Sequence, residues 1–173
     1  MTSTSIAPAP GTLALIGLGH SDCGDDGVGC LVAERVRRVA PTQVQVFIPG
    51  GDLFSLLDAW AGADLAIVVD AAASGAPVGF VHRLDGVGAI LPNEVARCST
   101  HGVGLREALA LAEALGRLPN RLLLYAIEGR EFAPGASPSA ATLAAVDDVV
   151  LRVLADLDQA ASDRKEIACT KLH

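Results

Sequence analysis

The sequence predicts an α/β fold, a three-layer α/β/α sandwich around a mostly parallel central sheet of about five strands. Short apolar runs typical of buried strands alternate with amphipathic helical patterns along the whole chain. Hydrophobic residues make up 51% of the sequence, whereas aromatic residues make up only 3%. The core must therefore be built from Ala, Val, Leu and Ile, which suits a sheet covered by Ala/Leu-rich helices.

The order of the elements follows from these runs. Strands are expected at residues 12–16, 44–48, 65–69, 79–84 and 121–127. The first, third and fifth are almost wholly apolar, as expected for central strands buried on both faces. Helices are expected at residues 28–39, 53–60, 105–115 and from 140 to about 157. Pro41, Gly62 and Gly116 end the first three helices.

The length of 173 residues suits one domain with a full hydrophobic core, so residues 1–173 are expected to form a single domain. Residues 1–10 are small and polar, with two prolines, and lack the basic and apolar regions of a signal peptide. They are expected to form a flexible leader. Residues 162–173 carry mixed charge and are expected to form a frayed tail.

Charge and cysteine content exclude several classes of function. The net charge of −7 argues against nucleic acid or an anionic membrane surface as a partner, because both require a basic patch. The apolar runs are too short to span a membrane. The scattered cysteines contain no CxxC pair, which argues against a structural zinc site and favours reduced thiols in the cytoplasm. They are Cys23, Cys30, Cys98 and Cys169.

The loop between the first strand and the first helix is the most informative stretch. Residues 17–27 hold four glycines, three aspartates and no Lys or Arg. The glycines indicate a sharp turn with close backbone approach, and the aspartates disfavour a phosphate as the ligand. We interpret this loop as one wall of a metal-linked active site. The alternative is a tight turn in which Asp25 or Asp26 merely caps the helix.

Two further residues are expected at the same edge of the sheet. In open α/β sheets, the site lies beyond the carboxyl ends of the strands at the topological switch point. Asp70 follows an apolar strand, Asp26 begins the first helix, and His101 precedes the third helix. Two carboxylates and an imidazole would form an open ligand set suited to Zn²⁺ or Ni²⁺. Alternatively, Asp70 caps a turn and His101 is a solvated loop residue.

Residues 16–20 (IGLGH) and 24–29 (GDDGVG) resemble the opening motif of the [NiFe]-hydrogenase maturation endopeptidase family. Three later segments match its other motifs in order, with agreement in spacing from about residue 13 to residue 157. They are the Gly50-Gly51 pair, residues 68–71 (VVDA) and residues 99–101 (STH).

The resemblance implies a hydrolase, an endopeptidase that removes a C-terminal extension from a hydrogenase large-subunit precursor after nickel insertion. By this resemblance, Asp26, Asp70 and His101 correspond to the family's metal-contacting and catalytic residues. Nickel is then held by the precursor, and whether the enzyme holds a metal of its own stays open. The family is classed with aspartic-type peptidases, so either nickel polarises the scissile carbonyl or a water, or a carboxylate acts as general base. A cytoplasmic monomer is expected.

Two positions depart from the family pattern. The first acidic position is often Glu and is Asp26 here, which shortens its reach by one methylene. The usual Asn after the second glycine is His20, either as a tolerated loop substitution or as an extra nitrogen ligand.

Two other functions compete with the endopeptidase interpretation. A dinucleotide-binding enzyme is disfavoured because Asp22 occupies the third glycine position of that fingerprint. A non-catalytic metal- or precursor-binding chaperone on the same scaffold is the second rival.

Overall fold

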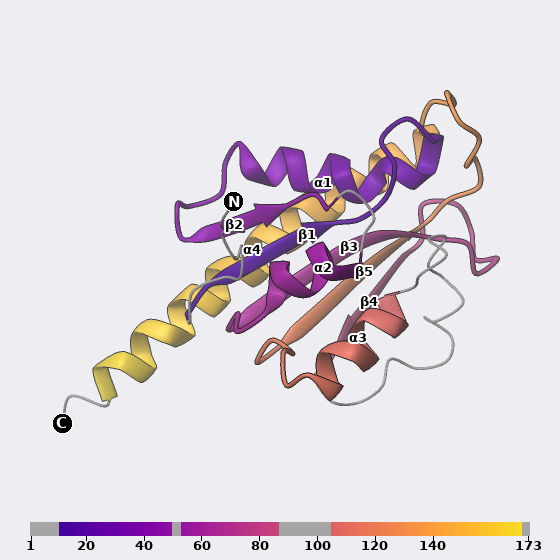
Figure 1. Ribbon diagram of the computed structural model, residues 1–173. Helices are drawn as coiled ribbons and strands as arrows, with labels where there is room; N and C mark the ends of the chain where they lie inside the picture. The colour runs from indigo at the N-terminus through magenta and orange to yellow at the C-terminus, as the bar shows by residue number, and fades with distance from the viewer. Residues whose placement is uncertain (1–10, 50–52, 87–104, 171–173) are drawn as a thin grey trace, which may run out of the picture.

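The computed structural model describes residues 11–49, 53–86 and 105–170 of the chain (Figure 1). The strands are β1 (Leu13–Gly17), β2 (Val44–Phe47), β3 (Leu65–Ala72), β4 (Val81–Asp85) and β5 (Leu122–Glu128). The α-helices are α1 (Val28–Arg37), α2 (Leu53–Trp60), α3 (Leu105–Ala114) and α4 (Ala140–Thr170). A short 3₁₀ helix, η1 (Gly24–Gly27), leads directly into α1. Each predicted strand and helix is therefore present, with shifted ends.

The five strands form one sheet in the order β2-β1-β3-β5-β4. All neighbours pair in parallel except β4, which pairs antiparallel with β5 at the edge. Every residue of β1, β3 and β5 is buried, which explains why these segments are nearly continuous apolar runs. The predicted, mostly parallel sheet of five strands is confirmed.

Helices cover both faces of this sheet (Figure 1). On one face, α1 and α4 pack with Leu15, Ile67 and Tyr125 of the strands. On the other face, α2 and α3 pack with Ile16 and Val68. Alternate strand residues thus feed two separate cores, since successive side chains of a strand point to opposite faces. The three-layer arrangement predicted from the sequence is confirmed.

Two elements are longer than predicted. The strand β3 continues through Asp70 to Ala72, because β5 runs alongside and pairs Ala71 with Ile127 and Ala72 with Glu128. The helix α4 does not end near residue 157 but continues to Thr170. Its last part, residues 158–170, contains neither Gly nor Pro, and about half of its residues are Ala, Gln, Glu, Lys or Arg, which favour helices. None of the described helices is long and apolar enough to cross a membrane.

The strand order also locates the candidate site. The chain leaves β1 for β2 on one side, and later returns to place β3 on the other side of β1. The carboxyl ends of β1 and β3 therefore flank the topological switch point of the sheet, where α/β proteins bind their ligands. The short helix η1, which follows β1, contacts β3 beside this point.

Candidate active site

The loop between β1 and η1 is folded tightly by its glycines. Gly19 has a φ of +115°, and a Cβ added there would lie 1.9 Å from the carbonyl oxygen of Asp26. The residue must therefore be a glycine, both for its backbone conformation and for the space it leaves. This contact presses the start of the loop against η1 and fixes the position of Asp26.

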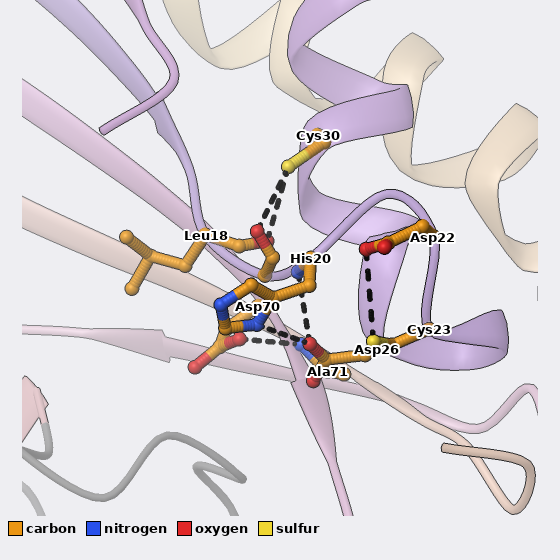
Figure 2. A network of polar contacts seen from close by, with 9 residues as sticks. Leu18, His20, Asp22, Cys23, Asp26, Cys30, Asp70 and Ala71 are labelled. Carbon is orange, nitrogen blue, oxygen red and sulfur yellow. Dashed lines mark hydrogen bonds and ion pairs between the residues drawn. The ribbon is translucent and has the colours of Figure 1, made fainter. Parts of the chain in front are cut away.

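Asp26 is buried, with 5% of its surface exposed. Its Oδ2 accepts a hydrogen bond from the backbone N–H of His20 at 2.8 Å, and Nδ1 of His20 lies 3.1 Å from the same oxygen (Figure 2). The ring of His20 is itself 58% exposed. Asp26 is thus no helix cap of the ordinary kind, because neither η1 nor α1 has a side-chain capping bond.

Asp70 lies within β3 and not beyond its end, since the strand is longer than predicted. Its side chain is on the same face of the sheet as Val68, and only 2% of the residue is exposed. One carboxylate oxygen, Oδ1, accepts a hydrogen bond from the backbone N–H of Ala71 at 2.8 Å (Figure 2). A buried carboxylate on an otherwise apolar strand is costly, and such groups persist where they bind something.

Asp26 and Asp70 belong to neighbouring parts of the structure. The backbone N–H of Leu18, just after β1, donates to the carbonyl of Val69 at 2.8 Å, and η1 contacts β3. Asp70 directly follows Val69 in β3, and Asp26 lies in η1. The structure therefore places the two predicted acids on adjacent segments at the switch point.

Cys30 is buried beneath this corner. Its Sγ donates to the carbonyl oxygen of Gly19 at 3.3 Å. Burial chiefly, followed by the negative charges of Glu34, Asp26 and Asp70, raises the pKa of the Cys30 thiol to about 11. The thiol is therefore protonated at neutral pH, which excludes it as a nucleophile.

The third predicted site residue, His101, lies outside the described residues, as do Gly50 and Gly51. Within the described ranges, no group of three or more His, Cys, Asp or Glu side chains is arranged to hold a metal ion. Asp26 and Asp70 supply two carboxylates with oxygen ligands that suit a divalent cation. The three-residue site with His101 stays a prediction.

Asp25 has a different role from its neighbour Asp26. It is fully buried and binds the loop that joins β5 to α4. The donors to its carboxylate are the backbone N–H groups of Arg130 (2.8 Å), Glu131 (3.1 Å) and Ser139 (2.7 Å) and the hydroxyl of Thr142 (2.6 Å). Burial alone would raise the pKa of Asp25, but these hydrogen bonds outweigh it and lower the pKa below its ordinary value.

A fourth buried acid among the described residues was not predicted from the sequence. Glu128 ends β5 and is 2% exposed. Its carboxylate accepts hydrogen bonds from the Ser74 hydroxyl at 2.9 Å and from the Gly75 N–H at 2.7 Å, and lies 3.5 Å from Nε2 of His82. The signal was present, because Glu128 follows an apolar run as Asp70 does. These contacts give Glu128 a structural role in fixing the turn after β3.

Known proteins resemble this chain in sequence and in fold. The sequence model of the hydrogenase maturation proteases (HycI) matches residues 30–156, a range that includes Asp70 and His101 and begins just after Asp26. The hydrogenase expression/formation protein HupD of Thiocapsa roseopersicina is 32% identical over 124 residues, which are 67% of this chain and 53% of that protein. The chain thus spans about half the length of this curated relative.

Solved structures agree with the fold. The hydrogenase maturating endopeptidase HybD from E. coli superimposes with a TM-score of 0.76 at 22% identity, covering 86% of this chain and 93% of that one. The [NiFe] hydrogenase maturation protease HybD from Thermococcus kodakarensis gives a TM-score of 0.65 at 24% identity, covering 82% and 96%. The family resemblance drawn from the motifs is confirmed, because the family's sequence model extends over most of the chain. This chain belongs to the hydrogenase maturation protease family.

Proposed function

We propose that this protein is an endopeptidase that removes the C-terminal extension of a [NiFe]-hydrogenase large-subunit precursor after nickel insertion. The observation that carries the proposal is the pair of buried carboxylates, Asp26 and Asp70, at the switch point of the sheet. Family membership supports the reaction class, and the motif match supports His101 as the third member of the site.

Peptide hydrolysis needs a group that takes a proton from the attacking water and returns it to the leaving amine. A buried carboxylate at the switch point can do both, which is the basis for assigning an aspartic-type mechanism. Nickel belongs to the precursor in this proposal and enters with the substrate, where it polarises the scissile carbonyl or the water. Asp26, Asp70 and His101 are the residues that would contact it.

We also propose that the enzyme acts as a monomer in the cytoplasm. Cys23 and Cys30 are both free thiols in the structure, as is usual where the cell keeps cysteines reduced. The precursor is the proposed partner, and its extended C-terminal segment would have to reach the crevice above β1 and β3.

The test is incubation of the full chain with nickel-loaded large-subunit precursor, followed by intact mass measurement of the precursor. We expect loss of one discrete C-terminal peptide with the wild-type chain and none with metal-free precursor. Asp70→Asn and His101→Ala should abolish the cleavage. The matched control is Asp85→Asn, which changes an acid at the opposite edge of the sheet, where it pairs with Arg121, and should cleave normally.

Two outcomes would contradict the proposal. Undiminished cleavage by Asp70→Asn or His101→Ala would show that these residues do not form the active site. A stable complex with the precursor and no change in mass would favour a maturation chaperone instead of an endopeptidase.

A further inference from the structure

His20 holds the carboxylate of Asp26 at two points. The backbone N–H and the ring Nδ1 of His20 both reach the same oxygen, Oδ2, at 2.8 and 3.1 Å (Figure 2). A carboxylate held by one hydrogen bond can still turn about its Cβ–Cγ bond, but two donors from one residue restrict that rotation. The exposed His20 therefore sets the orientation of the buried Asp26.

The backbone supports the same contact. Gly19 packs against the backbone carbonyl of Asp26, and the backbone N–H of His20 donates to its carboxylate. Residues 19 and 20 thus contact both the main chain and the side chain of Asp26. The contact is therefore held by the fold of the loop. It does not depend on the ring alone, and removal of the ring should leave Asp26 in place but less well oriented.

The pairing also fixes where the ring carries its proton. An ionised carboxylate only accepts hydrogen bonds, so the ring nitrogen that contacts Asp26 has to be the one that bears hydrogen. We propose that His20 is a positioning residue of the cleavage reaction, which orients Asp26 by donating Nδ1–H and its backbone N–H to Oδ2. The inference rests on the proposed function.

This role explains how a histidine fits where the opening motif of the family usually has asparagine. Nδ1 of histidine and Nδ2 of asparagine are both bonded to Cγ, so they lie the same number of bonds from the backbone. Asparagine at position 20 would thus place an N–H donor near the same oxygen of Asp26. Glutamine carries a similar amide one methylene further out and would not.

The experiment compares His20→Asn, His20→Gln and His20→Ala in the full chain, with kcat and KM measured on nickel-loaded precursor. We expect the Asn variant to keep a kcat close to that of the wild type. The Gln and Ala variants should lose roughly 10–100-fold in kcat, the range typical for supporting residues of a site, with little change in KM. An Asn variant as impaired as the Ala variant, or an Ala variant with unchanged kcat, would overturn the inference.

A second readout does not depend on activity. Nitrogen-15 NMR of the neutral imidazoles distinguishes Nδ1–H from Nε2–H, and the His20 signal is identified by its loss in His20→Asn. We expect the Nδ1–H form in the wild type and its loss in Asp26→Ala, while the Nε2–H form in the wild type would contradict the pairing. A wild-type chain that does not cleave the precursor would overturn the proposed function and the reaction role of His20, whereas the NMR result would still decide the contact with Asp26.

Discussion

Asp25 and Asp26 are adjacent in the chain and both are buried, yet their carboxylates contact different parts of the molecule. The carboxylate of Asp26 faces His20 within its own loop. The carboxylate of Asp25 instead binds the distant loop before α4, including the N–H of Ser139, 114 residues later. Asp26 is thus held within its own loop at the proposed site, while Asp25 anchors that loop to the rest of the molecule.

Replacement of Asp25 by Asn should destabilise the protein strongly. An amide offers one acceptor oxygen and turns its NH₂ group toward donors, so buried N–H groups of the loop before α4 lose their partner. We expect a loss of about 3 kcal/mol in the free energy of unfolding, measured by urea denaturation near neutral pH. Asp22→Asn, an exposed neighbour in the same loop, is the control and should change the stability little.

The effect of Asp25 should also depend on pH. Since its pKa is lowered in the folded protein, its stabilising contribution is complete above the unfolded pKa of about 3.9 and is lost as the pH falls through the lower folded value. The stability difference between the wild type and Asp25→Asn should therefore narrow below about pH 4. A difference that stays constant over this range would contradict the assigned hydrogen bonds.

At the scale of elements, the site depends on how closely α1 lies over β1 and β3. A Cβ on Gly29, in the first turn of α1, would lie 2.2 Å from the carbonyl oxygen of Leu18 and 2.4 Å from that of Val69. Both atoms belong to backbone, which cannot move aside as a flexible side chain can. The absence of a side chain at Gly29 is what brings Asp26 and Asp70 into one corner.

Gly29→Ala should therefore impair both stability and cleavage. We expect a loss of about 1–3 kcal/mol from the forced separation of α1 from the strands, together with a lower kcat on the precursor. Gly86→Ala is the matched control, because no atom lies within 4 Å of the added Cβ there. Equal activity and stability of the two variants would show that the close approach of α1 does not matter for the site.

At the scale of the whole molecule, one sheet separates two cores. Leu57 of α2 belongs to one core and Val153 of α4 to the other, and both are fully buried. The chain's one tryptophan, Trp60, lies in the same core as Leu57. Because every central strand contributes to both cores, we expect the two faces to unfold in a single transition.

Val153→Ala tests this cooperativity. It should cost about 2 kcal/mol and shift the unfolding midpoint reported by Trp60 fluorescence, although Trp60 lies on the other face of the sheet. Far-UV circular dichroism should give the same midpoint. Leu57→Ala should cost about 3 kcal/mol by both probes, and the exposed Leu151→Ala should cost little. Separate midpoints for the two probes in Val153→Ala would contradict the expectation of a single domain.

The layers, the order of the elements and the family could all be predicted from the sequence. Apolar runs, helical spacing and glycines are local signals, since each depends on residues close together in the chain. They were enough to place Asp26 and Asp70 at the edge of the sheet where ligands bind.

Contacts between distant parts of the chain are what distinguish the two neighbouring acids of the loop. Asp25 and Asp26 are indistinguishable by type and by position in the loop, and only the packing of residues 130–142 against the loop assigns Asp25 to the anchor. The added length of β3 likewise depends on pairing with β5, more than 50 positions away in the chain. Burial and hydrogen bonds between distant segments set the role of a carboxylate, and neither can be deduced from its sequence neighbours.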